Sequence, residues 1–227
     1  MEQEITLSEN CKYNCPFCFN GKNPFIEFPI PEITSNKVII YDPAFLSKKN
    51  VLDVIKELGS KRVNNKIVYF ELLQGINIRD LTFDIAKALK DNHFINIRFA
   101  WDGSYSKNNM YRVLDSINLL KKGGYKPKDL MCYILSNYYV RLRECLYKNK
   151  IMLEKHIRVC NCVYRKNYLD PEVYYEHWSK IEVEYYKQEC RMNNQIIDFK
   201  GYDPEIEKRL IRAKMMPNLK NINTESD

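Results

Sequence analysis

Short hydrophobic runs alternate along the chain with longer segments in which apolar residues recur at helical spacing. The short runs are rich in β-branched and aromatic residues, which is typical of strands. We predict strands at Ile5–Ser8, Lys37–Tyr41, Lys66–Leu73, Ile95–Trp101, Leu130–Leu135 and Ile157–Val163. Amphipathic stripes between them predict helices over Val51–Leu58, Leu81–Leu89, Met110–Leu120 and, more weakly, Tyr139–Glu154. Ser47 is the expected N-cap of the first helix and Gly123-Gly124 the expected C-cap of the third.

A strand–helix alternation of this kind predicts an α/β fold with a parallel sheet and helices outside it. Six units are too few for a closed eight-fold barrel, so we expect a partial (β/α)6 TIM-like barrel. After Arg165 the pattern changes: residues Pro171–Lys214 are expected to form helices of mixed charge, and Pro217–Asp227 a frayed polar tail. We therefore predict a core barrel over residues 1–168 and a helical C-terminal extension over 169–227, in the same domain or appended to it.

Composition restricts the class of protein. The chain has 227 residues, 45% of them hydrophobic and 29% charged, as expected for a folded globular protein. It has no apolar run of about 18 residues that could span a bilayer, and no apolar segment follows its first residues as in a signal peptide. We expect a cytoplasmic protein without a membrane partner. The net charge of +7 allows an anionic partner but does not require one.

Cysteines carry the strongest chemical signal. Of eight cysteines, Cys11, Cys15 and Cys18 fall within eight residues directly after the first predicted strand. Clustered cysteines in a chain without an export signal indicate a metal or redox site rather than disulfides. Iron–sulfur cubes are normally held by four cysteine thiolates, so three local ligands would leave one iron open. Two alternatives remain: a structural zinc site closed by a distant residue such as His156, and simple packing of buried cysteines.

The spacing C-x3-C-x2-C, with the aromatic Phe17 just before Cys18, resembles the signature of the radical S-adenosylmethionine (SAM) superfamily. The resemblance implies a partial (β/α)6 barrel. It also implies a 4Fe–4S cluster that reductively cleaves SAM to a 5′-deoxyadenosyl radical, which then acts on an unidentified substrate. An electron donor such as flavodoxin or ferredoxin would be the partner. The chain would then be an enzyme of unknown reaction outcome.

Three further stretches resemble the cobalamin-type, methylthiotransferase-like branch of that superfamily. They are a D-x-x-F element at Asp42–Phe45, a Q-G-x-x-x-R element at Gln74–Arg79 and an R-F-A-x-D element at Arg98–Asp102. Asp42-Pro43-Ala44 stands where the superfamily commonly has Gly-Gly-Glu. We also expect no cobalamin-binding domain, because the first predicted strand begins at about residue five.

Polar residues at the ends of the predicted strands lie where a barrel carries its functional rim. Asp42 is a candidate hydrogen-bond acceptor for the SAM ammonium, Arg79 a partner for its carboxylate, and Asp102 an acceptor for the ribose hydroxyls. Gln74-Gly75 suggests either a close backbone approach to a ligand or a bulge. The alternative for each is an ordinary loop residue, turn or surface arginine.

Other features favour simpler interpretations. Cys160 and Cys162 share one strand face and could hold an auxiliary cluster or act as redox thiols, but burial in the core is favoured. The three histidines share no ligand spacing.

Basic and aromatic side chains between residues 138 and 168 suit a nucleic acid substrate, although a solvated helix face is favoured. They are Arg141, Arg143, Lys148, Lys150, Lys155, Arg158, Arg165, Lys166, Tyr138, Tyr139, Tyr147, Tyr164 and Tyr168. The alternative function is a zinc- or cluster-containing nucleic-acid-binding module without catalysis.

Overall fold

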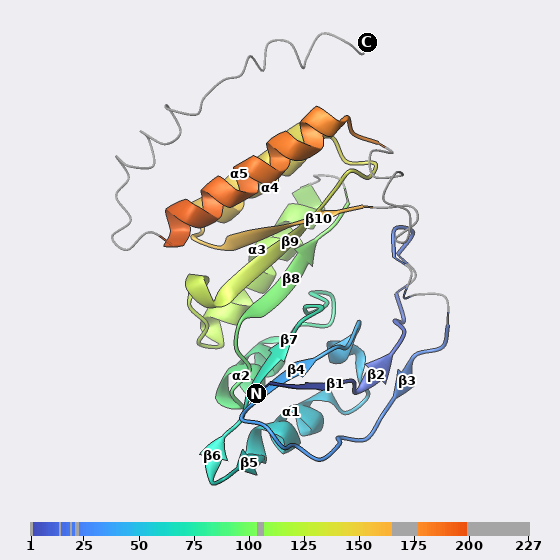
Figure 1. Cartoon of the computed structure of the whole chain (residues 1–227), viewed down its shortest axis with the longest axis vertical. Helices are drawn as coiled ribbons and strands as arrows, with labels where there is room; N and C mark the ends of the chain where they lie inside the picture. The colour runs from blue at the N-terminus through green and yellow to red at the C-terminus, as the bar shows by residue number, and fades with distance from the viewer. Residues whose placement is uncertain are drawn as a thin grey trace.

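The computed structural model describes residues 2–13, 15–18, 20, 23–103, 107–164 and 177–198, shown in Figure 1. The strands are β1 Gln3–Ile5, β2 Ser8–Glu9, β3 Ile26–Glu27, β4 Lys37–Ile40, β5 Arg62–Val63, β6 Lys66–Ile67, β7 Tyr69–Leu72, β8 Ile97–Trp101, β9 Leu130–Ser136 and β10 Arg158–Val163. The helices are α1 Val51–Ser60, α2 Phe83–Asp91, α3 Lys107–Lys122, α4 Leu142–Glu154 and α5 Lys180–Asp198, with short 3-10 turns η1 Phe45–Ser47 and η2 Pro127–Asp129.

Two three-stranded parallel sheets form the centre, in the orders β1-β4-β7 and β8-β9-β10. Isolated parallel bridges, Phe70 with Phe94 and Ile76 with Phe99, join β7 to the segment of β8. The strands therefore follow one another in chain order, and four crossovers carry α1 to α4. The predicted α/β class with parallel strands and helical crossovers is confirmed, while the described strands do not close into a ring.

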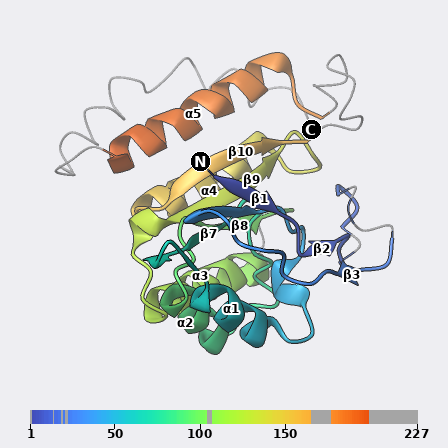
Figure 2. The same ribbon diagram turned by 60° about the horizontal axis from the view of Figure 1, so that its bottom comes forward.

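Hydrophobic side chains on one face of the strands pack against the helices. Phe70, Leu72 and Phe99 are buried there with Ile55 of α1 and Leu89 of α2. Alternate residues of each strand point to the opposite face, which we call the cavity-side face because several of them line the main cavity. Figure 2 shows α1, α2 and α3 together on one side, with α5 alongside β10 away from them.

Helix α3 ends at a glycine cap, as predicted. Gly124 has φ +107°, and the N–H groups of Gly124 and Tyr125 donate to the carbonyls of Lys121 and Leu120 at 3.0 and 3.1 Å. This is the Schellman pattern, in which a left-handed residue lets two orphan carbonyls of the last turn find donors.

Three local predictions were wrong. The first strand ends at Ile5, because the N–H groups of Leu7 and Ser8 bind the Asp42 carboxylate and the chain turns away to pair β2 with β3. The run Lys66–Leu73 is two strands: Asn64 and Asn65 both have positive φ, so β6 folds back onto β5 before β7 begins.

Ser47 is the third correction, since it does not cap the first helix. Its hydroxyl donates to Asp80 Oδ2 at 2.7 Å, and α1 begins at Val51 after Asn50. The observed cap of α2 is Thr82, whose hydroxyl accepts from the N–H of Ile85 at 3.2 Å.

The C-terminal helix α5 packs on β10 and α4. Asn194 exchanges two hydrogen bonds with the backbone of Val159, at 2.9 and 2.8 Å, and Tyr186 is fully buried. Trp178 donates its indole N–H to the carbonyl of Val140 at 2.7 Å. The predicted boundary at residue 168, the rest of the predicted helices from 171 to 214 and the polar tail from 217 lie outside the described residues.

Candidate metal and cofactor site

A cavity of about 490 Å³ lies at the C-terminal ends of the strands. Seven of the eight predicted site residues line it, all except Asp42. They come from three separate parts of the chain: the cysteine loop (residues 11–20), the loop after β7 and the end of β8. The seven are Cys11, Cys15, Phe17, Cys18, Gln74, Arg79 and Asp102. Parallel strands bring their carboxyl ends to one edge, so side chains distant in sequence share this cavity.

The cysteine loop is a series of tight turns. The N–H of Cys15 donates to the carbonyl of Tyr13, and the N–H of Cys18 to that of Cys15, both at 3.0 Å. The N–H of Asn20 donates to Cys18 Sγ at 3.4 Å. Burial raises the pKa of the Cys15 thiol, while the nearby Arg79 guanidinium opposes that rise. A bound cation would be needed to hold this thiol as a thiolate at neutral pH.

A compact metal site is not formed by these thiols alone. Among the residues that the structure describes, no three His, Cys, Asp or Glu side chains converge closely enough to hold a single metal ion. His156 also cannot complete a zinc site with the loop, because it lies between α4 and the start of β10, at the opposite edge of the sheet. Three thiols that line one cavity without converging on a point do not by themselves form the compact tetrahedral set that a structural zinc ion needs.

Asp80 holds the cysteine loop from the side, a role that the sequence did not suggest. Its carboxylate accepts hydrogen bonds from Lys12 Nζ at 2.9 Å, from the Tyr13 hydroxyl at 2.6 Å and from the Ser47 hydroxyl at 2.7 Å. Burial on its own would raise the pKa of Asp80, but these three donors outweigh it and the pKa is lowered. The carboxylate is therefore ionised and joins the loop to η1 and to the segment before α2.

Asp42 does not face the cavity, which corrects its predicted role. It is buried, and its Oδ1 accepts from the N–H groups of Leu7 and Ser8 at 2.7 and 2.9 Å. Its Oδ2 accepts from the Ser8 hydroxyl at 2.9 Å and pairs with Lys48 Nζ at 3.2 Å. With both oxygens engaged, Asp42 anchors the chain that enters the cysteine loop and has no free acceptor for a ligand ammonium.

The three remaining polar candidates differ in their surroundings. Arg79 is exposed, and its guanidinium lies 5.0 Å from the centre of the Tyr13 ring, within cation–π range. Gln74 is also exposed. Burial raises the pKa of Asp102 to about 6, against the opposing effect of Lys148 and Arg79. The cavity thus offers a cation, an amide and a carboxylate to a polar ligand.

Gly75 makes a close backbone approach, but to the protein rather than to a ligand. It has φ +84°, and a Cβ built there would lie 2.9 Å from the carbonyl oxygen of Arg98. The next N–H, of Ile76, donates to that same carbonyl at 2.7 Å. A residue without a side chain is therefore needed where the loop after β7 meets β8.

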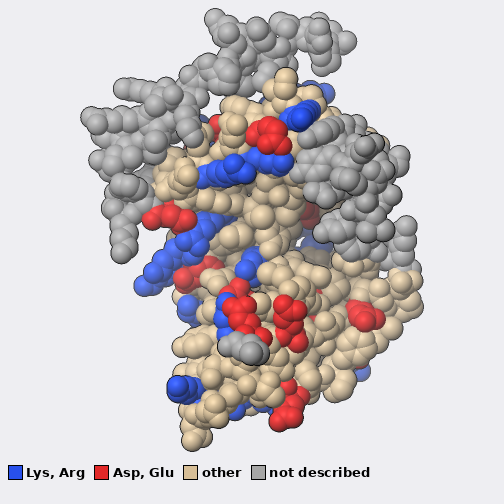
Figure 3. All heavy atoms as spheres, in the orientation of Figure 1, with Lys and Arg blue, Asp and Glu red and all other residues tan. Residues whose placement is uncertain are grey.

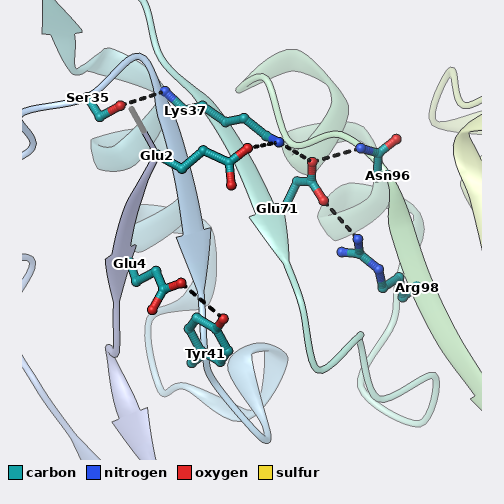
Figure 4. A network of polar contacts seen from close by, with 8 residues as sticks. All are labelled: Glu2, Glu4, Ser35, Lys37, Tyr41, Glu71, Asn96 and Arg98. Carbon is teal, nitrogen blue, oxygen red and sulfur yellow. Dashed lines mark hydrogen bonds and ion pairs between the residues drawn. The ribbon is translucent and has the colours of Figure 1, made fainter. Parts of the chain in front are cut away.

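A polar network covers the cavity-side face of the first strands (Figure 4). Glu71 is its centre: it accepts from Asn96 and Arg98, both at 2.8 Å, and pairs with Lys37 at 3.5 Å. Lys37 also pairs with Glu2. Burial would raise the pKa of Glu71, but the hydrogen bonds from Asn96 and Arg98 leave it lowered. This face is therefore polar, in contrast to the apolar face beneath the helices.

Aromatic rings gather beside the cysteine loop. Phe17 meets Tyr138 edge to face at 5.6 Å between ring centres, and Tyr138 in turn meets Tyr164 at 4.6 Å. Tyr139 is 78% exposed and lies 4.3 Å from the His177 ring. We call Tyr138, Tyr139, Tyr164 and His177 the aromatic rim. Phe17, which lines the cavity, brings the aromatic rim next to the cavity through its contact with Tyr138.

The predicted basic surface is weaker than the sequence suggested. Lys148 is fully buried and donates to the carbonyls of Trp101 and Gly103, and Arg158 pairs with Asp198. Arg165, Lys166 and Tyr168 lie outside the described residues. On the face seen in Figure 1, Figure 3 shows acidic and basic side chains interleaved over the described surface.

No model of a known protein family matches this chain, and a search of curated proteins found no match. Within the described parts of the chain, no helix is both long and apolar enough to cross a bilayer.

Proposed function

We propose that this chain is a radical SAM enzyme built on a partial (β/α)6 barrel. The observation that carries the proposal is that Cys11, Cys15 and Cys18 line one cavity together with Phe17, Gln74, Arg79 and Asp102. The volume of about 490 Å³ falls in the range of small-molecule sites. The chain order of the six parallel strands, β1-β4-β7 followed by β8-β9-β10, supports the barrel.

The residues have separate tasks in this proposal. The three loop thiolates hold a 4Fe–4S cluster and leave one iron open. When bound, such a cluster supplies the electron that splits the sulfonium bond of SAM and so yields a 5′-deoxyadenosyl radical. Arg79 binds the SAM carboxylate, and Asp102, the carboxylate that lines the cavity, accepts from the ribose hydroxyls. Ile76, Trp101 and Leu135 line the wall and limit access of water.

Anaerobic reconstitution tests this proposal. We expect about four irons per chain, as one cubane requires. Changing Cys11, Cys15 and Cys18 together to Ala should abolish iron binding, whereas Cys160→Ala and Cys162→Ala should leave it intact. Protein reduced by dithionite, flavodoxin or ferredoxin should release 5′-deoxyadenosine from SAM. A colourless protein with one zinc per chain, or a reconstituted protein that binds SAM without producing deoxyadenosine, would refute the proposal.

Arg79 gives a test of the SAM-binding mode. Loss of a charge-assisted contact in Arg79→Ala should weaken SAM binding by about 1.5–3 kcal/mol. The matched control is Arg143→Ala, which removes an exposed arginine of α4 that does not line the cavity. Equal affinities of the two variants would place Arg79 outside the SAM site.

A nucleic acid substrate is a second candidate, favoured by the aromatic rim. Exposed rings beside a cavity can stack unpaired bases, each contributing about 1–3 kcal/mol. Fluorescence anisotropy with tRNA and single-stranded DNA at two salt concentrations tests it, because binding that neutralises phosphates weakens steeply with salt. Absence of binding at low salt would leave a peptide or a small metabolite.

A further inference from the structure

Lys148 is a fully buried lysine of α4 whose ammonium binds the backbone at the end of β8. Lys148 Nζ donates to the carbonyl of Trp101 at 3.2 Å and to the carbonyl of Gly103 at 2.5 Å. It also lies 5.7 Å from the centre of the Trp101 ring, within cation–π range. Among the described residues, no carboxylate forms an ion pair with this ammonium, so its partners are a ring and two carbonyls.

A lysine in this position is costly for the fold. Taking an ammonium out of water without a paired carboxylate is unfavourable, and an apolar side chain of similar length would fill the same space without that penalty. The two hydrogen bonds to the carbonyls offset only part of the cost. Packing alone therefore does not explain why residue 148 is a lysine, and the segment that it holds is the place to look for a reason.

The two bound carbonyls belong to the residues on either side of Asp102. The pairing of β8 with β9 ends at Trp101, so Asp102 is the first residue that the sheet no longer fixes. Gly103 follows with φ +72° and with open space where a side chain would be. Lys148 thus holds the backbone of Asp102 from both sides, although Lys148 is not among the described residues that line the cavity.

The cavity wall gives the direction of Asp102 its importance. Tyr133 and Leu135 of β9 and Cys162 of β10 line the same cavity, which also shows that the expected core placement of Cys162 was wrong. The Tyr133 hydroxyl is already engaged, since it donates to the carbonyl of Leu73 at 2.9 Å. Among the described residues that line the cavity, Asp102 is the one carboxylate. Its orientation therefore decides whether a charged acceptor faces a ligand with hydroxyl groups.

We propose that Lys148 is a positioning residue, which holds the carbonyls of Trp101 and Gly103 so that the Asp102 carboxylate faces the cavity and accepts from the ribose hydroxyls. The inference rests on the proposed SAM site and adds a residue that acts on it from outside. Lys148 does not contact the ligand and acts through Asp102 alone. Its removal should therefore have no effect on SAM binding once Asp102 has been removed.

A double-mutant cycle tests this, with the SAM affinity of the anaerobically reconstituted protein measured by equilibrium dialysis. Asp102→Ala should weaken binding about tenfold or more, because a charge-assisted hydrogen bond is lost. Lys148→Met should weaken it by about three- to tenfold, and the double variant should bind no more weakly than Asp102→Ala. The matched control is Lys150→Met, the same substitution at an exposed lysine of α4, which should bind SAM as wild type does.

A second measurement separates positioning from general damage to the site. Lys148→Met should lose affinity for 5′-deoxyadenosine but not for the analogue that lacks both ribose hydroxyls, whereas a distorted cavity would bind both more weakly. If Lys148→Met does not fold, Lys148→Gln takes its place, because its amide can still donate to one of the carbonyls.

The outcomes distinguish this inference from the function on which it rests. Wild-type affinity in the Lys148 variant, losses that multiply in the double variant, or equal weakening of both nucleosides would overturn the role of Lys148 and leave the SAM site in place. A reconstituted wild type that binds no SAM would overturn the proposed function and this inference together.

Discussion

A substitution of Asp80 should make the cysteine loop open more easily, although it changes no cysteine. Its carboxylate receives the Tyr13 hydroxyl at 2.6 Å and Lys12 Nζ at 2.9 Å from the loop, and the Ser47 hydroxyl at 2.7 Å from η1. Asp80→Ala removes all three contacts together. Among its described contacts, the loop then keeps its backbone turns, the Phe17–Tyr138 ring contact and the Arg79–Tyr13 contact.

The free energy that each hydrogen bond to Asp80 contributes depends on how exposed its donor is. A hydrogen bond to a charged group contributes about 1.5–3 kcal/mol, and the Tyr13 contact is partly buried. The Lys12 side chain is 46% exposed, so its ion pair adds at most about 0.5 kcal/mol. We expect local opening of the loop to become easier by about 2–3 kcal/mol, which raises the open population roughly 30- to 150-fold.

Limited trypsin digestion measures that population at the Lys12–Tyr13 bond. When the loop recloses faster than it is cut, the cleavage rate follows the equilibrium opening. Asp80→Ala should therefore be cut at Lys12 faster than wild type by that factor. The control is Asp91→Ala, which breaks the exposed pair with Lys87 on α2 and should leave the rate at Lys12 unchanged. Equal rates for wild type and Asp80→Ala would refute the assigned tether.

The same tether has a defined pH dependence. The pKa of Asp80 is lowered in the folded protein, so its stabilising effect is complete above the unfolded value of about 3.9 and is lost as the pH falls through the lower folded value. The stability difference between wild type and Asp80→Ala in urea should be constant above about pH 5 and shrink below pH 4. A difference that grows on acidification would contradict the carboxylate's role.

Three further predictions concern the supports of the cavity. Asp42→Ala should cost about 3–5 kcal/mol of unfolding free energy because Lys48 is left buried and unpaired; urea unfolding checks this, and adding Lys48→Met should recover part of the loss. Gly75→Ala should lower the free energy of unfolding by about 1–3 kcal/mol, because φ is +84° and the new Cβ meets the Arg98 carbonyl. The control, Gly103→Ala, should lower it less, because Gly103 has a similar positive φ but open space around it. The pKa of Asp102 is raised from 3.8 to about 6, so the free energy of unfolding should fall by roughly 3 kcal/mol as the pH rises between these values. Asp102→Asn should remove that fall. The same pH profile in wild type and Asp102→Asn would contradict the prediction.

The arrangement of the strands and the position of the cysteine loop could be predicted because both depend on local patterns. Short apolar runs such as Leu130–Leu135 predicted the strands, and a parallel order places the end of every strand at one edge. The loop that follows β1 and the segments after β7 and β8 consequently had to meet, which is why Arg79 and Asp102 were expected near the cysteines.

The direction of individual side chains could not be predicted in the same way. Asp42 follows a strand end as Asp102 does, yet it points beneath the loop because Lys48 and two backbone N–H groups bind it there. Asp80 gathers three donors from positions 33 to 68 residues away. Cys160 and Cys162 were correctly expected to share a face, but whether that face met helices or the cavity depended on the register with β9.

The two aspartates together suggest how a loop of cysteines can be held before any cofactor arrives. Asp42 fixes the chain as it leaves β1, through two N–H groups and a buried lysine, and Asp80 fixes the first turn through Tyr13. Neither carboxylate binds a cysteine, so the thiols remain available. A loop ordered in advance loses less conformational entropy on binding, which increases affinity without any additional ligand contact. In this chain the cysteine loop is therefore supported by two acids that lie outside the C-x3-C-x2-C spacing.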